Sequence, residues 1–413
     1  MKKIGKPLHY AFGLAMLVLC FPMLYQMTKF YWTKNLLGYQ APPKDYAFSW
    51  TALQDSLVDS IKVGSYQANV EKHLRYDLRA KHMMIRFNNE LKYDMYGEFT
   101  LPDIAQGKEG WLFNPGSFEV WKSQDYTDSF RVERKMRYLK KTTDTLELMY
   151  GTKFLFFIAP SKAAVIPEFH PDSVFTGAHD TLRSYRIRRN ALARNDIPVL
   201  DTYPLFLRWK EHELENIFTK GGVHWSQLGA YRVWDTLYRR IEDMTGLDMI
   251  DYSYQDTIKT KRPNKIDRDL ADAANLLWSS LVKETYQYPK LKLEESQGKD
   301  KPSVLIIGDS FFWNIHQERI PHQFFAEDFI FYYYFREAYN LGEKHWSTLA
   351  ELPDFEEVIA NRDLIMVMIN LTNMQSCCWG FLNDMRDSLL GRPAWADQKD
   401  EVWASAVEPP TNP

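Results

Sequence analysis

A short, wholly apolar run that ends in a polar turn places the strongest constraint on the fold of this chain. Val304 to Ile307 carries four apolar residues and is followed at once by Gly308-Asp309-Ser310. Such a run is typical of a strand buried on both faces of a parallel sheet. Open α/β sheets place their chemistry at the carboxyl ends of these strands. Ser310 is therefore a candidate nucleophile, and a nucleophilic serine needs a base nearby.

Similar apolar runs alternate with helical segments along the chain. The five strand candidates are Lys153 to Ile158, Ile197 to Leu200, Val304 to Ile307, Phe329 to Phe335 and Leu364 to Ile369. The helical segments include Arg131 to Tyr150, Thr181 to Arg194, Pro204 to Ile217 and Gln227 to Met244. This alternation predicts an α/β fold, with a central, mostly parallel five-stranded sheet covered by helices on both faces.

The 413 residues favour one large domain with additions. We expect a stalk over 33–48, a catalytic domain over 49–390 and a loose tail over 391–413. The beginning of that domain, Ser49 to Asn89, is predicted to be helical. A polar stretch over about 246–302 is predicted to be an insertion, with one helical piece at Asp267 to Glu284.

The N-terminus predicts membrane attachment. Three lysines, at positions 2, 3 and 6, precede the uncharged segment Tyr10 to Tyr25, and aromatic residues follow at Phe30-Tyr31-Trp32. A basic flank before an apolar run is an export signal whose lysines stay in the cytoplasm. No small-residue cleavage site follows, so residues 1–32 are predicted to be an uncleaved signal anchor. The protein would then be a single-pass protein of the inner (cytoplasmic) membrane, with its C-terminal domain in the periplasm or another extracytoplasmic space.

Composition argues against several classes of partner and cofactor. A net charge of −3 gives no reason to expect nucleic acid. The cysteines are Cys20, in the predicted anchor, and the adjacent Cys377-Cys378, which make no disulfide framework. No Cys/His spacing resembles a zinc site, so we expect neither a metal nor another cofactor.

The carboxyl ends of the predicted strands gather at one edge of the sheet and carry polar side chains. These include Ser161 and Lys162, Asp201 and Thr202, Asp309 and Ser310, Arg336 and Glu337, and Asn370, Thr372 and Asn373. His224, just before the helix predicted from Gln227, is the candidate general base for Ser310. Backbone N–H groups after Ser310, with Asn370 or Asn373, are candidates for holding an oxyanion. The alternatives are that Ser310 only caps a helix and that His224 is a structural residue beside Trp225.

The roles of two acidic and two basic residues at this edge are not decided by the sequence. Asp309 is adjacent to the nucleophile and should point elsewhere, so we expect it to stabilise the turn. Asp201 is a candidate for the acid that orients His224. Lys162 and Arg336 are candidates for binding an acidic substrate, or are solvated or ion-paired.

The order of motifs along the chain resembles a known family. The motifs are Gly107-Lys108-Glu109-Gly110-Trp111-Leu112-Phe113, Pro160-Ser161-Lys162, Ile166-Pro167-Glu168, His224-Trp225-Ser226 and Gly308-Asp309-Ser310-Phe311. Together they resemble the alginate O-acetyltransferases of the AlgX and AlgJ type, over roughly Ser49 to Asn373. These are SGNH-hydrolase-like proteins, in which the histidine precedes the serine in a circularly permuted motif order.

The resemblance implies a three-layer SGNH-like sandwich and a reaction. Acetyl groups would be transferred to hydroxyls of an exported or cell-surface polysaccharide, through an acetyl-serine at Ser310. A membrane-bound O-acyltransferase would be the partner that supplies the acetyl groups. Two other functions stay open: a carbohydrate acetylesterase, and a non-catalytic glycan-binding or scaffold subunit of an export complex.

One position departs from the family pattern. The family's sequence Asp-x-His-Trp places the triad acid two residues before the histidine, and this chain has Gly222 there. Loss of that acid can reduce the rate by orders of magnitude. Three outcomes follow: another carboxylate such as Asp201 or Glu168 substitutes, a Ser–His dyad suffices, or the protein is weakly active and mainly binds.

Overall fold

The computed structural model describes residues 81–389, apart from 126, 177–179, 279–280, 342–344, 347–357 and 361. The chain divides into two compact units, Met1–Thr100 with Ala274–Ser280, and Leu101–Ala273 with Leu281–Pro413. The described part of the first unit contains helix α5 (Lys81–Tyr96). There the Glu90 carboxylate accepts hydrogen bonds from the N–H groups of Leu277 and Trp278. The candidate site lies entirely in the second unit.

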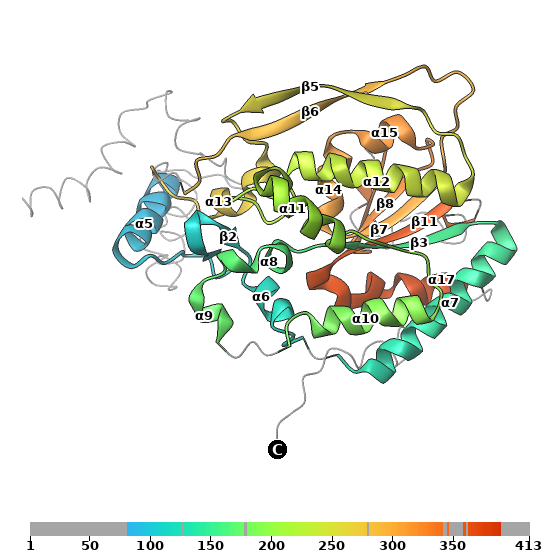
Figure 1. Cartoon of the computed structure of the whole chain (residues 1–413), viewed down its shortest axis with the longest axis horizontal. Coiled ribbons are helices and arrows are strands. Elements are labelled where there is room, and N and C mark those ends of the chain that lie inside the picture. The colour runs from blue at the N-terminus through green and yellow to red at the C-terminus, as the bar shows by residue number, and fades with distance from the viewer. Residues whose placement is uncertain are drawn as a thin grey trace, which may run out of the picture. The chain divides into compact units, whose positions relative to one another are not determined.

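A seven-stranded sheet forms the centre of the second unit, in the order β10-β9-β8-β7-β11-β3-β4 (Figure 1). Its strands are β3 (Lys153–Ala159), β4 (Val199–Asp201), β7 (Val304–Gly308), β8 (Ile330–Tyr333), β9 (Glu337–Asn340), β10 (His345–Trp346) and β11 (Leu364–Asn370). The five predicted strands are β3, β4, β7, β8 and β11, and every pair of neighbours among them is parallel. The five-strand prediction was incomplete, because β9 and β10 extend one edge with antiparallel pairing.

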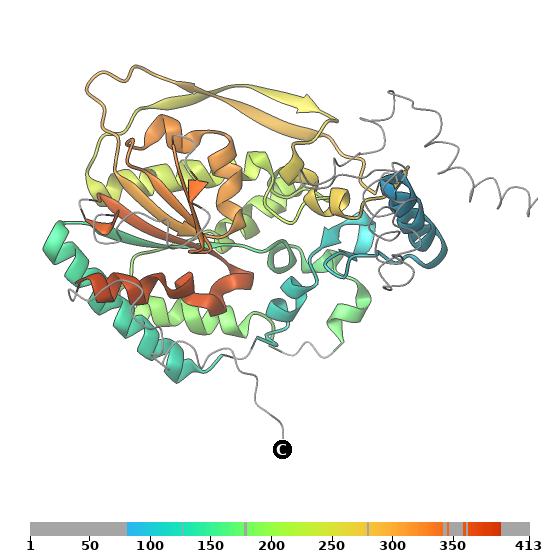
Figure 2. The same ribbon diagram turned by 180° about the vertical axis from the view of Figure 1, so that it is seen from behind.

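Helices cover both faces of this sheet, as Figures 1 and 2 show from opposite sides. One face carries α7 (Ser129–Tyr150), α10 (Arg183–Arg194) and α17 (Phe381–Leu389). The other carries α11 (Tyr203–Ile217), α12 (Gln227–Thr245), α14 (Trp313–Gln317) and α15 (Ile320–Phe324). Short elements complete the unit: β1 (Ala105–Gln106), β2 (Leu112–Phe113), α6 (Gly116–Trp121), α8 (Lys162–Val165), α9 (Asp172–Phe175), and the 3₁₀ turns η2 (Lys108–Gly110), η3 (Pro167–Phe169), η5 (Ser310–Phe312) and η7 (Leu371–Gly380).

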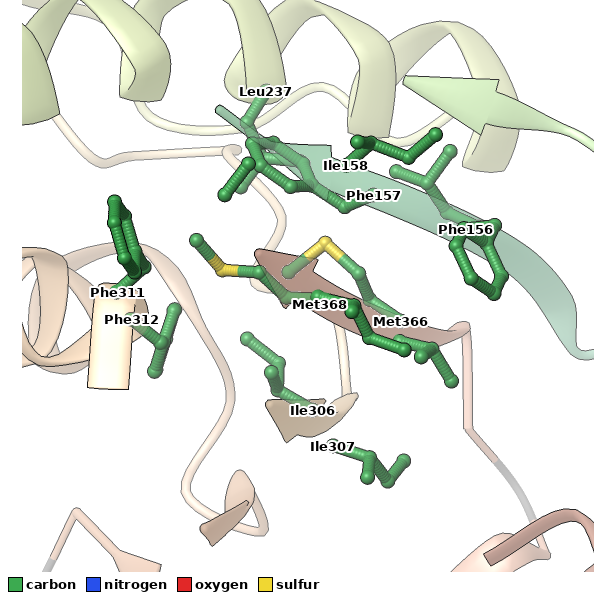
Figure 3. Close-up of a cluster of buried hydrophobic side chains, with 14 of the residues drawn as sticks. Phe156, Phe157, Ile158, Leu237, Ile306, Ile307, Phe311, Phe312, Met366 and Met368 are labelled. Carbon is green, nitrogen blue, oxygen red and sulfur yellow. The ribbon is translucent and has the colours of Figure 1, made fainter. Parts of the chain in front are cut away.

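The core lies between the sheet and these helices. Every residue of β7 and β11 is buried, which is why both read as unbroken apolar runs. Figure 3 shows Phe157 of β3, Met368 of β11 and Leu237 of α12 in one apolar cluster. All three are fully buried. This packing fixes the register of β11 against β3 and β7, and so aligns the ends of the three central strands.

The insertion differs from the prediction. It contains a two-stranded antiparallel ribbon, β5 (Tyr252–Thr260) and β6 (Tyr286–Leu293), which the sequence did not predict. The helical piece expected over Asp267 to Glu284 is shorter, with the 3₁₀ turn η4 (Lys265–Arg268) followed by α13 (Asp269–Ala273). The seven central residues of β5 are exposed, so this strand lacks the apolar alternation that reveals a half-buried strand. Strand β6 does alternate, with Leu291 and Leu293 less exposed than Lys290 and Lys292.

Several predicted segments lie outside the described residues: the anchor over 1–32, the stalk, the first part of the predicted catalytic domain and the tail over 391–413. Among the helices that the structure describes, none combines the length and the apolar character needed to cross a membrane.

Candidate functional site

Ser310 lies immediately beyond the carboxyl end of a buried central strand. Strand β7 ends at Gly308, where a Cβ would approach the Met368 carbonyl oxygen to 3.3 Å. The chain then turns at Asp309, whose Oδ1 accepts a hydrogen bond from the Phe311 N–H at 3.1 Å. Asp309 is thus the N-cap of η5, and Ser310 is its first residue. The cap interpretation of Ser310 was wrong, and its hydroxyl is available for another contact.

That contact is with the predicted base. The Oγ of Ser310 lies 2.8 Å from Nε2 of His224, within hydrogen-bond distance. If the hydroxyl donates to Nε2, the imidazole proton of a neutral His224 is on Nδ1. The two residues are far apart in the sequence, and the fold brings them together as the sequence predicted.

The loop that carries His224 is anchored on both sides of the histidine. Trp225 is fully buried, with its ring centroid 5.1 Å from that of Phe311. Ser226 caps α12 by accepting a hydrogen bond from the Gly229 N–H. The His224 ring is itself edge-on to Phe311, with centroids 4.9 Å apart. The ring is therefore held by packing as well as by its polar contacts.

A carboxylate that the sequence did not single out lies against the other side of the histidine. Oδ2 of Asp269 lies 2.8 Å from Nδ1 of His224. The alignment falls short of hydrogen-bond geometry, so we describe it as a close contact between a carboxylate oxygen and the ring nitrogen. Catalytic contacts of this kind are often poorly aligned without substrate and tighten when it binds. Asp269 begins α13 in the polar insertion, and no spacing relative to His224 distinguishes it from neighbouring acids.

The two acids proposed from the sequence lie elsewhere. Asp201 accepts hydrogen bonds from the Tyr185 hydroxyl at 2.5 Å and from the Tyr203 N–H at 3.1 Å. Burial raises the pKa of the Asp201 carboxyl above its ordinary value, although those bonds oppose the rise. Glu168 is ion-paired with Lys210 at 2.8 Å. Asp201 as the orienting acid was therefore wrong, since its carboxylate stabilises the end of β4.

Lys162 has a structural position rather than a solvent-facing one. Its Nζ donates to the carbonyl oxygens of Thr219 at 3.1 Å, of Lys220 at 3.3 Å, and of Gly222. Burial lowers the pKa of this ammonium group to about 7, while the charges of Asp269 and Glu284 oppose the shift. Lys162 therefore stabilises the loop that precedes His224, with its bonding capacity used by three carbonyls.

Arg336 differs from Lys162 in being exposed. It lies in the turn between β8 and β9, where its N–H donates to the Tyr333 carbonyl oxygen at 3.1 Å. It is absent from the lining of the cavity at Ser310. The structure therefore does not bring Arg336 to the site.

Asn370 and Asn373 both lie beside the serine turn. Asp309 Oδ2 accepts hydrogen bonds from the Asn370 N–H at 2.7 Å and from Asn373 Nδ2 at 2.9 Å. Burial raises the pKa of the Asp309 carboxyl, and these bonds oppose the rise. Asp309 thus stabilises the turn, as predicted, and also ties it to the end of β11. The Asn370 side chain is engaged with the backbone at Ala159 and Thr372.

Tyr334 is a further residue of the site that the sequence did not reveal. Burial raises the pKa of its hydroxyl, while hydrogen bonds with the side chain and backbone of Ser310 and with the side chain of Asn373 oppose that rise. Its backbone has a φ of +51°, and that of Phe335 is +52°. Two consecutive residues in the left-handed region are strained, and strain of this kind gathers at functional sites. Tyr334 and Ser310 both line the cavity described below.

A cavity of about 250 Å³ opens beside Ser310. Its lining combines polar groups from four strand ends with the rings of Phe113, Phe311 and Tyr334. Within the described ranges, no cluster of His, Cys, Asp and Glu side chains could hold a metal ion. The arrangement offers a serine that lines a small pocket, a base in contact with that serine, and polar groups in the lining. These are the groups that acyl transfer requires.

Comparison with protein families gives one extended match. The model described as "SGNH hydrolase-like domain, acetyltransferase AlgX" matches residues 104–317, which is just over half of the 413 residues. The matched range contains Ser310, His224 and Asp269. A search of the curated proteins found no match.

Solved structures with a similar fold are distant in sequence. The O-acetyltransferase domain of Pseudomonas putida AlgJ is 16% identical, with a TM-score of 0.43 that covers 70% of this chain and 100% of that one. Pseudomonas aeruginosa AlgX is 14% identical, with a TM-score of 0.44 and coverage of 73% and 69%. Bacillus cereus PatB1 is 13% identical, with a TM-score of 0.39 and coverage of 66% and 96%.

Proposed function

Because the chain belongs to the family of SGNH hydrolase-like acetyltransferases of the AlgX type, we propose that it transfers acetyl groups to hydroxyls of an exported or cell-surface polysaccharide through an acetyl-serine. The observation that carries the proposal is the contact of 2.8 Å between His224 Nε2 and the Oγ of Ser310, a residue that lines the cavity. This contact gives a hydroxyl the base it needs to become a nucleophile.

The first half of the reaction loads the serine. Ser310 Oγ attacks the carbonyl carbon of an acetyl ester donor while His224 Nε2 accepts the hydroxyl proton. The tetrahedral intermediate collapses by breaking the bond between that carbon and the leaving oxygen. The imidazolium returns its proton to the leaving oxygen, so the donor departs as an alcohol and Ser310 carries the acetyl group.

The second half unloads it onto the acceptor. A sugar hydroxyl enters the cavity, gives its proton to His224 Nε2 and attacks the acetyl carbonyl. The bond between Ser310 Oγ and the acetyl carbon breaks, and the imidazolium returns the proton to the serine. Water in place of the sugar would release acetate, so transfer depends on occupancy of the cavity by the acceptor.

The negative oxygen of each tetrahedral intermediate needs donors. Three groups of the cavity lining could donate to it: the N–H of Ser310, the Tyr334 hydroxyl and the Asn373 amide. Donors of this kind act most strongly in a site from which water is excluded. Both predicted asparagines already make hydrogen bonds, Asn370 with the backbone and Asn373 with Asp309, so neither is preferred on this ground.

The place of action and the partner belong to the same proposal. The basic, then apolar N-terminal sequence supports an anchor in the inner membrane with the acetyltransferase domain outside the cytoplasm. A membrane-bound O-acyltransferase would supply the acetyl groups across that membrane.

The proposal is tested with a fluorophosphonate probe and an acetyl ester donor. Wild type should be labelled at Ser310, whereas Ser310→Ala should not, and His224→Ala should be labelled at least about 100-fold more slowly. With donor and an acetylatable oligosaccharide, mass spectrometry should detect acetylated oligosaccharide. Release of free acetate alone would indicate an esterase. Unchanged glycan acetylation in cells that carry Ser310→Ala would favour a non-catalytic subunit.

A further inference from the structure

The geometry points to Asp269 as the positioning residue that completes the catalytic machinery: a carboxylate supplied by the insertion, on which the orientation of His224 depends. The inference rests on the proposed function, which supplies the reaction that His224 would catalyse. Its evidence is a separate set of contacts, those around Asp269. It assigns to the polar insertion a part in catalysis that neither its sequence nor its exposed ribbon indicates.

The two carboxylate oxygens of Asp269 have different partners. Oδ1 accepts hydrogen bonds from the N–H groups of Val223 and Leu270, both at 2.8 Å. Oδ2 is thereby turned toward His224 Nδ1, 2.8 Å away. The Val223 bond ties the carboxylate to the residue just before the histidine. Asp269 thus fixes both the loop and the ring that the loop carries.

Two further bonds join the same loop to the insertion. The Thr219 hydroxyl donates to the Asp267 carbonyl oxygen at 2.6 Å, and the Ala271 N–H donates to the Gly221 carbonyl oxygen at 3.0 Å. The histidine loop and the segment around α13 therefore form one hydrogen-bonded junction. Asp269 lies at its centre and is not an incidental surface neighbour.

Other carboxylates near the site are already committed. Asp309 bonds to the Phe311 and Asn370 N–H groups and to the Asn373 amide. As described above, Asp201 is bound at the end of β4, and Glu168 is paired with Lys210. Among the described residues, Asp269 is the acid with an oxygen against His224 Nδ1.

Steric crowding explains why the acid cannot come from position 222. A Cβ on Gly222 would lie 2.7 Å from Thr219 Oγ1, 2.9 Å from the Ile266 carbonyl oxygen and 3.1 Å from the Asp267 carbonyl oxygen. Two of these three contacts are backbone atoms of the insertion. The segment that supplies Asp269 thus occupies the space that a side chain at 222 would need.

The carboxylate has two effects on the histidine. It holds the proton on Nδ1, which leaves Nε2 free to accept the serine proton. It also stabilises the imidazolium that forms during each half-reaction. Asp309, Lys162 and Asp267 are other charged groups close to this pair. All three are retained when Asp269 alone is changed, so a variant at 269 isolates its contribution.

The experiment compares Asp269→Asn and Asp269→Glu with wild type, Ser310→Ala and Asp272→Asn. Asp272 is the matched control, because it lies on the same helix but is 55% exposed and paired with Arg268. The readouts are the labelling rate of Ser310 by a fluorophosphonate as a function of pH, kcat and KM for acetyl transfer, and the NMR signal of the His224 Nδ1 proton. Thermal unfolding reports folding of each variant.

We expect Asp269→Asn to lower kcat and the labelling rate by about 100- to 10,000-fold, with little change in KM. The low-field Nδ1 signal should disappear, Asp269→Glu should restore part of the rate, and Asp272→Asn should match wild type.

Labelling of folded Asp269→Asn within about threefold of wild type at all pH values would overturn the inference. If Asp269→Asn fails to fold, the Asp269→Glu variant decides the question. A labelling profile and a His224 Nδ1 signal in Asp269→Glu that match those of wild type would support the role. A folded, fully active Asp269→Glu that has lost both the wild-type profile and the Nδ1 signal would overturn it. Wild type that labels in an Asp269-dependent manner but transfers no acetyl group would refute the proposed function and leave this inference standing.

Discussion

The central sheet and the insertion over 246–302 contribute to the same site in opposite ways. The sheet is buried on both faces and presents Ser310 at the end of β7, at a position that a local run of apolar residues already indicates. The insertion is largely exposed in its ribbon, yet its short helix α13 places Asp269 against His224. A polar, weakly patterned segment can therefore hold a site residue as firmly as a core strand, provided that backbone hydrogen bonds fix it.

The largest loss of stability should come from a substitution in the core of the central sheet. Phe157→Ala removes a fully buried ring between β3 and Trp225 and should lower the free energy of unfolding by about 3–5 kcal/mol. Urea unfolding followed by tryptophan fluorescence measures the change. A loss below about 1 kcal/mol would mean that this core is looser than its burial indicates.

The junction between the two regions should be nearly as sensitive. Gly222→Ala places a Cβ against backbone carbonyls of the insertion and should cost about 1–3 kcal/mol, with a further fall in the labelling rate of Ser310. Gly222→Asp should be worse, although it restores an acid two residues before the histidine. Wild-type stability and labelling in Gly222→Asp would show that the junction can open to admit the side chain.

A pH-dependent contribution should come from Lys162, beneath the same loop. Its pKa in the folded protein is about 7, below the ordinary value of 10.5. Above pH 7 the unfolded chain therefore binds the proton that the folded protein releases, so stability rises with pH in this window. Relative to Lys162→Met, wild type should gain about 1 kcal/mol between pH 7 and 8. Parallel urea titrations at the two pH values test this, and an unchanged difference would contradict a lowered pKa.

The smallest effect is expected at the exposed ribbon. Ile258→Ala on β5 truncates a side chain that is 45% exposed and should change the free energy of unfolding by less than about 0.5 kcal/mol. Acetyl transfer by this variant should match wild type when both are assayed at the same donor concentration. A large loss of activity without loss of stability would mean that the ribbon takes part in binding the acceptor.

Features that depend on residues close together in the sequence could be predicted, and features that depend on contacts between distant segments could not. The strands of the sheet were predictable because burial on both faces demands unbroken apolar runs, as in Val304 to Ile307. The pairing of Ser310 with His224 was predictable because parallel strands share one carboxyl edge, with the family motifs giving the order. Strand β5 was missed because an exposed strand needs no such pattern, whereas the alternation over Lys290 to Leu293 in β6 was a signal that the prediction did not include.

Asp201 and Asp269 show where sequence reasoning fails. Both are acids near predicted element ends, and Asp201 follows a strand whose end lies at the site edge. Only the packed structure shows that Tyr185 and the Tyr203 backbone hold Asp201. The choice between them depends on which hydrogen-bond donors surround each carboxylate, and those donors come from distant parts of the chain.

The sequence by itself determined the α/β sheet, the serine at its edge, the histidine before α12 and the family. These features depend on local apolar patterning and on short motifs, both of which can be recognised in the sequence without the structure. The tertiary structure decided which acid faces the histidine, that Lys162 is bound to the loop, and that Tyr334 lines the same cavity as Ser310. Those outcomes depend on the space left at Gly222 and on hydrogen bonds between segments that meet only when the chain is packed.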